Sequence, residues 1–174
     1  MAEGAIRLDW AGHNMQRQQL VLTAIGAYQL EEVLNASARL TEHDIAHSVV
    51  YMLEPGRFRT PRTSGEQARA VPDDLQKQLY PDSVAARIFV THTRPETMLG
   101  VLQPLNTGDC TAALGFIVQG GTLTTPGLLF VNRCTWAHVL QEAARVLGMS
   151  DEELLSAEER AALSGQTSPE GVII

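Results

Sequence analysis

Two runs of apolar residues, each closed by a turn, mark the centre of the predicted fold. Residues 20–25 (LVLTAI) are apolar without alternation and end at Gly26, a pattern typical of a parallel strand that is buried on both faces. Residues 46–53 (AHSVVYML) are rich in β-branched side chains and stop at a Glu-Pro-Gly turn. From Ala27, apolar residues recur every three or four positions, which predicts an amphipathic helix of about four turns. Strand, helix and strand together predict a parallel βαβ unit.

Further strands and helices are predicted around this unit. Alternating apolar and polar residues over 5–10 predict a half-buried strand at a sheet edge. The clearest later helix covers 135–148, where Thr135 can cap the first turn and Gly148 can end the helix. A capping box begins another helix at Ser156. Two more strands are predicted at 86–92 and 112–118, helix starts at 64 and 72, and short helices at 95–105 and 125–131.

These elements predict a three-layer α/β sandwich whose sheet is mostly parallel, with about five strands and one of them antiparallel. The length of 174 residues suits a single domain. We assign residues 1–150 to this domain, with 1–18 as its leading strand and turn. Residues 151–174 are predicted to form a short helix and a flexible acidic tail, because glycine, serine, threonine and proline dominate from Ser164.

Charge and cysteine content narrow the functional classes. The net charge of −7 disfavours nucleic acid as a partner, since an acidic surface repels phosphate backbones. The two cysteines, Cys110 and Cys134, form no disulfide framework and suit a reducing compartment, so we expect a cytoplasmic protein. The first residues lack the pattern of a secretory signal, and no apolar run is long enough to span a membrane.

The order and spacing of several segments resemble one known domain. Residues 20–26 (LVLTAIG) and 49–58 (VVYMLEPGRF) resemble the opening of the C-terminal domain of transketolase, in a family of thiamine-diphosphate enzymes that includes the beta subunits of 2-oxo-acid dehydrogenases. The last helix of that domain is similar to 135–148 (TWAHVLQEAARVLG). Weaker similarities follow the same order at 3–8, 86–96 and 114–126.

The resemblance implies which domains of the parent enzyme hold the cofactor and which do not. In this family two preceding domains hold thiamine diphosphate and Mg²⁺ at a dimer interface, and the C-terminal domain supplies packing, dimer contacts and partner docking. It therefore implies a non-catalytic C-terminal domain or subunit of an enzyme acting on a ketose phosphate or a 2-oxo acid. The expected partners are the remaining thiamine-diphosphate-binding domains and a second copy of the chain. The alternatives are a stand-alone interaction or regulatory module and a small anion-binding protein.

Two motifs hint at cofactor or metal chemistry. A thiamine diphosphate site needs a Gly-Asp-Gly motif with an asparagine about thirty residues later, whereas residues 108–110 read Gly-Asp-Cys, with Asn132 following. A polar loop is the preferred interpretation. His43 and His47 have the spacing of a zinc-binding helix. Because a strand is predicted from about residue 46 and no third ligand is evident, we interpret both as surface loop histidines and assign no catalytic, cofactor or metal residue.

Anion binding remains open at two places. Ligands of parallel sheets gather at the carboxyl ends of the strands, where His92, Arg94 and the pair Gly120 and Gly121 are predicted to lie. A hydrogen bond in the turn is the favoured alternative for His92. Arg57, Arg59 and Arg62 could form a phosphate clamp, but a solvated loop is likewise favoured for them.

Cys110 and Cys134 could act as nucleophiles. For both residues a buried structural thiol is the favoured interpretation.

Overall fold

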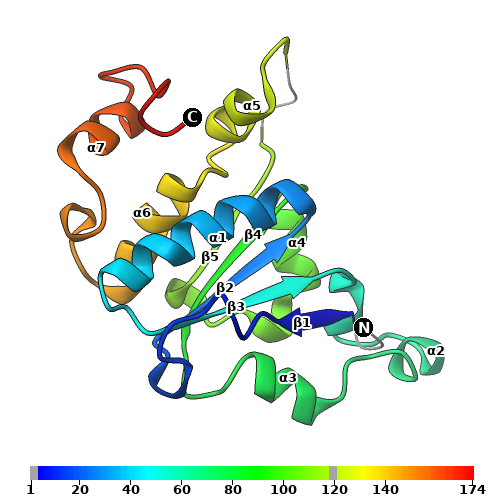
Figure 1. Cartoon of the computed structure of the whole chain (residues 1–174). Helices are drawn as coiled ribbons and strands as arrows, with labels where there is room; N and C mark the ends of the chain where they lie inside the picture. Colours follow the sequence, from blue (N-terminus) through cyan, green and yellow to red (C-terminus); the bar gives the residue numbers. More distant parts are fainter. Residues whose placement is uncertain (1–3, 118–120) are drawn as a thin grey trace.

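The sheet has five strands in the order β1-β3-β2-β4-β5 (Figure 1), in a computed structural model that describes residues 4–117 and 121–174. β1 pairs with β3 in antiparallel orientation, and all other neighbouring strands are parallel. This confirms the predicted α/β class and its single antiparallel strand. The strands are β1 (Ala5–Arg7), β2 (Leu20–Ile25), β3 (His47–Met52), β4 (Ala86–Thr91) and β5 (Thr111–Leu114).

Helices cover both faces of the sheet (Figure 1). Alternate residues of β2 point to opposite faces, so Leu22 packs with α1 and α6, whereas Val21 packs with the residues around α3 and α4. Central strands are therefore apolar throughout, as residues 20–25 predicted. The helices are α1 (Ala27–Glu42), α2 (Ser64–Gln67), α3 (Asp73–Leu79), α4 (Pro95–Val101), α5 (Thr125–Val131), α6 (Trp136–Leu147) and α7 (Ala157–Leu163). None of the described helices is long and apolar enough to cross a membrane.

Three predicted elements are shorter than expected. The first strand stops at Arg7 because the chain enters a turn two residues later. The short helix predicted at 95–105 divides into α4 and a 3-10 helix at Gln103–Leu105, since Pro104 lacks the N–H that a continuing α-helix needs. β5 ends at Leu114 rather than at 118, and residues 118–120 lie outside the described part of the chain.

The start of α6 is capped from another helix. Thr135 is the residue before the helix, as predicted, but its hydroxyl forms a 2.7 Å hydrogen bond with His138 Nδ1 and does not cap the backbone. The Glu32 carboxylate, on α1, accepts the N–H of Trp136 at 2.7 Å instead. A negative group is favourable at the N-terminus of a helix, so Glu32 joins α1 to α6.

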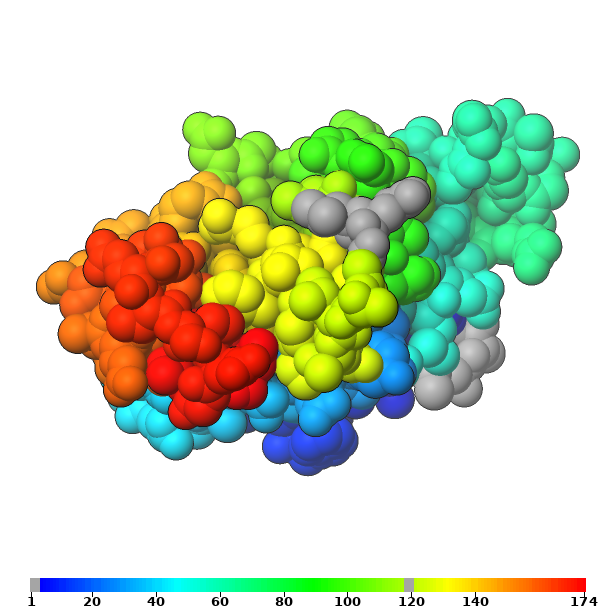
Figure 2. All heavy atoms as spheres, turned by 90° about the horizontal axis from the view of Figure 1, so that it is seen from above, coloured from blue at the N-terminus to red at the C-terminus, as the bar shows by residue number. Residues whose placement is uncertain are grey.

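The last residues pack against the domain rather than extending from it. Arg39 of α1 contacts Glu159 Oε1 at 3.0 Å, donates to the Leu154 carbonyl at 3.2 Å and lies 5.2 Å from the centre of the Trp136 ring. The Trp136 indole N–H donates to the Ile173 carbonyl at 3.2 Å, and Ile173 is buried. Figure 2 shows this C-terminal segment (orange to red) lying against α5 and α6. The predicted mobility of the tail stays a prediction.

Removing Arg39 tests how the C-terminal segment is attached. We expect Arg39→Ala to lower the free energy of unfolding by about 1–3 kcal/mol, because the buried Glu159 carboxylate loses its charged partner. Amide hydrogen exchange should accelerate in residues 151–174. The control is Arg7→Ala, whose partner Asp9 is 71% exposed, and this variant should lose less than about 1 kcal/mol. Equal losses in urea denaturation would contradict the anchoring role.

Candidate functional site

The carboxyl ends of β2 and β4 meet at a tight turn. His92 follows β4, and its Nδ1–H donates to the Ile25 carbonyl at 2.9 Å, while its backbone N–H contacts the same oxygen at 3.3 Å. A Cβ on Gly26 would lie 3.2 Å from His92 Nδ1, and Gly26 has a φ of +123°. Glycine is therefore required where β2 passes into α1. His92 makes the turn hydrogen bond that the sequence favoured.

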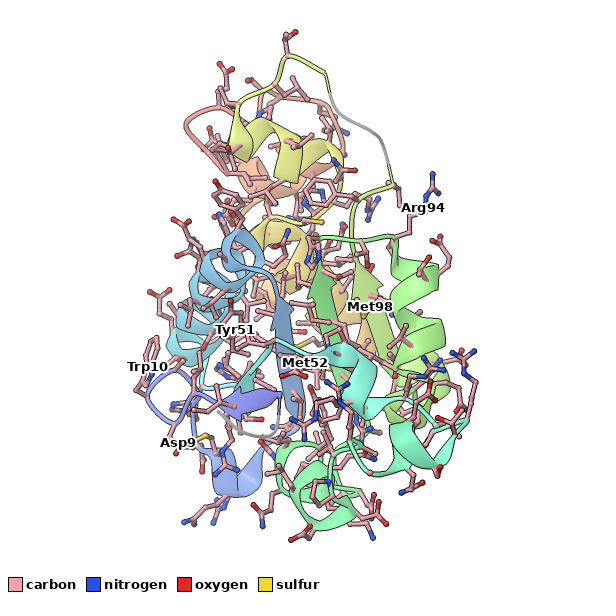
Figure 3. All side chains as sticks on the ribbon, turned by 90° about the vertical axis from the view of Figure 1, so that its right-hand side faces the viewer. Asp9, Trp10, Tyr51, Met52, Arg94 and Met98 are labelled. Atoms are coloured by element: carbon pink, nitrogen blue, oxygen red, sulfur yellow. The ribbon has the colours of Figure 1, made fainter. Side chains whose placement is uncertain are left out.

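The other residues of the predicted anion site are not joined to His92. Arg94 is exposed at the outer rim of this edge (Figure 3), and no hydrogen bond or ion pair of its side chain exists within the described part of the chain. Gly121 is also exposed, and Gly120 lies outside the described residues. No hydrogen bond links His92, Arg94 and Gly121 among the residues that the structure describes. An anion role for them stays a prediction.

A cavity of about 270 Å³ opens beside the end of β5. Glu96, Glu142 and Arg133 line it, so its charged groups favour a cation or a neutral polar molecule over an anion. Its wall is held by Asn132, whose Oδ1 accepts the Ile117 N–H at 2.9 Å and whose Nδ2 donates to the Leu128 carbonyl at 2.9 Å. The Asn132 amide is therefore engaged in the fold.

The two histidines of the zinc-like motif do not share a helix. His43 follows the end of α1, whereas His47 begins β3 and has no exposed surface. The interpretation of His47 as a surface loop histidine is therefore wrong. Its Nδ1–H donates to the Ile45 carbonyl at 2.7 Å, its Nε2 bonds the Ser37 hydroxyl at 2.7 Å, and burial lowers its pKa. No cluster of three or more potential ligands that could hold a metal exists among the described residues.

The thiols and the Gly-Asp-Cys sequence also belong to the scaffold. Cys134 is buried, its Sγ donates to the Asn132 carbonyl at 3.3 Å, and burial raises the pKa of this thiol to about 12. A protonated thiol is a poor nucleophile, which agrees with the structural role predicted for Cys134. Cys110 is half-buried at the end of a short 3-10 turn, Gly108–Cys110, directly before β5.

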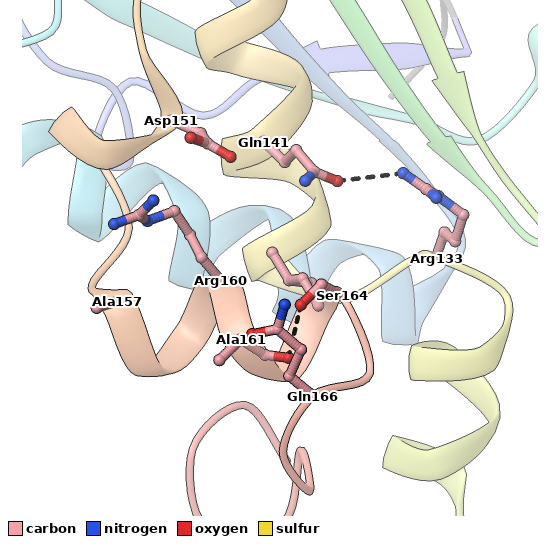
Figure 4. A pocket seen from close by; sticks show the side chains of 9 residues that line it. Arg133, Gln141, Asp151, Ala157, Arg160, Ala161, Ser164 and Gln166 are labelled. Atoms are coloured by element: carbon pink, nitrogen blue, oxygen red, sulfur yellow. Dashed lines mark hydrogen bonds between the residues drawn. The ribbon is translucent and has the colours of Figure 1, made fainter.

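A larger cavity, which the sequence did not indicate, lies between α6 and α7 (Figure 4). It measures about 500 Å³ and is walled by polar side chains, including Asp151 and Arg160. Arg133 Nη2 donates to Gln141 Oε1 at 3.1 Å across one wall. Arg133 has a φ of +57°, a conformation that usually selects glycine or asparagine, so no sequence rule would have placed this arginine there.

The predicted basic loop, which follows the carboxyl end of β3, forms a second group of hollows. One hollow of about 250 Å³ is lined by Arg57, Arg59 and Arg69 together with Glu54 and Glu66. The sequence pattern groups only Arg57, Arg59 and Arg62 and does not indicate Arg69. The loop folds back so that residue 69 returns to residue 57, and spacing along the chain does not show this.

Comparison with solved structures identifies the fold. The chain matches transketolase from Leishmania mexicana with a TM-score of 0.59 and 17% sequence identity over 90% of its length. It matches transketolase from Campylobacter jejuni with a TM-score of 0.57 and 14% identity over 84% of its length. It spans only about one fifth of those chains, 20% and 19% respectively. No family model and no curated protein matches the sequence. The chain therefore has the α/β fold of a transketolase C-terminal-like domain.

Proposed function

We propose that this chain is the non-catalytic C-terminal domain or subunit of a thiamine-diphosphate-dependent, transketolase-like enzyme that acts on a ketose phosphate or a 2-oxo acid. The observation that carries the proposal is the size relation: transketolase matches 84–90% of this chain, yet the chain spans only a fifth of transketolase. On this proposal the thiamine-diphosphate-binding domains are supplied by another part of the same protein or by a separate chain. The assembly is a homodimer and works in the cytoplasm.

The residues of the Gly-Asp-Cys sequence do not fit a thiamine diphosphate site. Such a site needs a carboxylate and an amide that converge on a metal bridging the phosphates. Asp109 is exposed in a 3-10 turn, and the Asn132 side chain already accepts from Ile117 and donates to Leu128. On this proposal the cofactor and Mg²⁺ are held by the other domains.

Three described groups with shifted pKa values, His47, His138 and Cys134, are used for packing. Perturbed groups in clefts are candidates for catalysis, but His47, His138 and Cys134 are all buried and bonded to their own fold. His138 bonds Thr135 and lies against the Phe130 ring, 5.2 Å between ring centroids. These contacts stabilise the domain and support a scaffolding role.

Exposed apolar side chains gather at the antiparallel edge of the sheet. Trp10 is 73% exposed, and Ile6 on β1 and Leu53 after β3 are 42% and 47% exposed. β1 and β3 are paired, so Ile6 and Leu53 belong to the same edge, where Figure 3 also shows Trp10. A large exposed aromatic residue beside apolar neighbours is typical of an interaction surface, which supports the assembly role.

Reconstitution tests this proposal. Purified chain should show no saturable heat with thiamine diphosphate and Mg²⁺ in calorimetry, and no turnover of ketose phosphates or 2-oxo acids. Adding a chain that carries the thiamine-diphosphate-binding domains should produce a stable complex and turnover. Trp10→Ser should weaken the complex by about tenfold, because the complex loses an aromatic side chain that its interface would bury. The control Tyr28→Ser, which alters another exposed aromatic residue on α1, should leave affinity unchanged.

Two results would overturn the proposal. Saturable cofactor binding or turnover by the isolated chain would show that it carries its own active site. A monomer that neither binds the cofactor-carrying chain nor changes its turnover would instead support a stand-alone interaction module.

A further inference from the structure

The loop between β3 and α3 concentrates positive charge on an acidic protein. Residues 57–69 contain four of the 13 basic residues of a chain whose net charge is −7: Arg57, Arg59, Arg62 and Arg69. Figure 2 shows this part of the chain (teal) in a lobe that projects from the body of the domain. Four guanidinium groups on one short loop repel one another unless a counter-charge lies among them.

Two hydrogen bonds to backbone carbonyls close this loop on itself. The Arg57 Nε–H donates to the Arg69 carbonyl at 2.8 Å, and the Val71 N–H donates to the Arg57 carbonyl at 2.9 Å. These two bonds bring the ends of the loop together and create the hollow of about 250 Å³. A second hollow of about 480 Å³, which Arg62 and Gln103 line, adjoins it at Arg59.

Glu66 is the internal counter-charge, and it holds the arginines loosely. Its Oε2 accepts the backbone N–H of Arg62 at 2.7 Å, which is the main reason that its pKa is lowered. Its Oε1 lies 3.5 Å from Arg59 Nη2 and 3.9 Å from Arg62 Nη2. Ion pairs of this length at a solvent-exposed site contribute little energy, so these guanidinium groups remain available to another anion.

The charge of the hollow selects the ligand. Three arginines and two glutamates line the hollow, so its described lining carries an excess of one positive charge, which favours an anion such as a phosphate group. Arg69 is exposed, and its side chain makes no hydrogen bond or ion pair within the part of the chain that the structure describes. The planar guanidinium group matches phosphate oxygens in pairs.

We propose that the hollow lined by Arg57, Arg59 and Arg69 binds the phosphate group of a small phosphorylated metabolite. Its volume suits a phosphate with a few further atoms, since whole drug-sized molecules need roughly 300–1,000 Å³. The site lies entirely on one loop of this chain. It therefore does not depend on the assembly proposed above, and it is separate from the predicted anion residues His92, Arg94 and Gly121.

Gly56 offers a way to fill the hollow without changing its charge. A Cβ on Gly56, which also lines the hollow, would meet no atom within 4 Å, and its φ is not in the left-handed region. Gly56→Leu is therefore tolerated by the backbone and places a branched side chain at the site. The matched control is Gly121→Leu, since a Cβ on Gly121 also meets nothing within 4 Å.

The test is a titration of the full chain with inorganic phosphate at pH 7.5, in which binding is monitored through amide chemical shifts. Saturable shifts are expected in residues 54–71. Arg59→Gln and Arg69→Gln should each weaken binding about tenfold, the loss of one charge-assisted hydrogen bond. Gly56→Leu should abolish binding, and Glu66→Gln should strengthen it by about threefold because a competing carboxylate is removed. Arg94→Gln and Gly121→Leu should bind like the parent.

The arginine variants test the proposed phosphate site even if Gly56→Leu fails to fold. Unsaturable shifts that chloride reproduces, or shifts that vanish in Arg94→Gln and persist in Arg59→Gln, would overturn the proposal. The second of these results would place the anion beside Arg94, after the carboxyl end of β4. Neither result bears on the reconstitution experiment, because that experiment measures assembly and turnover rather than phosphate binding.

Discussion

Replacing Tyr80 by alanine is expected to lower the free energy of unfolding by about 3–5 kcal/mol, the usual cost of deleting a large aromatic side chain from a core. Tyr80 is 2% exposed directly after α3. Its ring lies edge-on to Phe58, with 6.1 Å between ring centroids, and 6.0 Å from Phe89. Removal leaves a cavity under the central strands that these rings cannot fill, and urea denaturation monitored by circular dichroism measures the loss.

Tyr80→Phe separates the ring from its hydroxyl. The Tyr80 hydroxyl forms a 3.0 Å hydrogen bond with Thr23 Oγ1, and Thr23 is fully buried on β2. We expect a loss of about 1–2 kcal/mol, because the Thr23 hydroxyl is left without a partner. Tyr28→Ala, at a residue that is 59% exposed, should change stability by less than about 0.5 kcal/mol. A phenylalanine variant as unstable as the alanine variant would contradict the packing argument.

The centre of the fold could be predicted because its signals are local. The apolar run at 20–25 coincides with β2, and the run at 46–53 contains β3, His47–Met52. The helix predicted from Ala27 begins there and ends at Glu42. A strand that is buried on both faces needs an apolar side chain at almost every position, so such a pattern is rarely produced by a loop.

The end of β5 depends on a contact that spacing cannot reveal. A Cβ on Gly115 would lie 2.1 Å from the Thr93 carbonyl oxygen, so the chain passes directly over the turn after β4. The N–H of Phe116 then donates to that same oxygen at 3.1 Å and does not continue the sheet. The apolar residues after Leu114 resemble a strand in sequence, but this crossing redirects them.

The burial of individual polar residues likewise depends on partners that are distant in the sequence. His47 is buried because its backbone pairs with His13 in both directions, at 3.0 and 2.8 Å, and nothing near His47 in sequence announces this partner. Arg87 is likewise buried on β4, where it donates to the Leu105 carbonyl at 2.9 Å. The arginines of the basic loop were visible in the sequence, whereas the hollow among them depends on the bond between Arg57 and the Arg69 carbonyl.

Acid is expected to destabilise the domain through His138. Its imidazole is 4% exposed, and burial, together with the positive charge of Arg133, lowers its pKa to about 4. The unfolded chain takes up a proton near pH 6.5, so below that pH it binds more protons than the folded state. Stability is therefore complete above about pH 6.5 and falls progressively as the pH approaches 4. The loss due to His138 is about 3 kcal/mol.

His138→Gln should flatten this pH profile, since glutamine keeps hydrogen-bonding capacity toward Thr135 but does not titrate. The measurement is urea denaturation at several pH values between 4 and 8. Part of the slope should remain in the variant, because burial also lowers the pKa of His47, and His47 protonation acts in the same direction. The control His92→Gln changes an exposed histidine and should keep the parent profile. If His138→Gln leaves the slope unchanged, the buried imidazole is not the group whose protonation unfolds the domain.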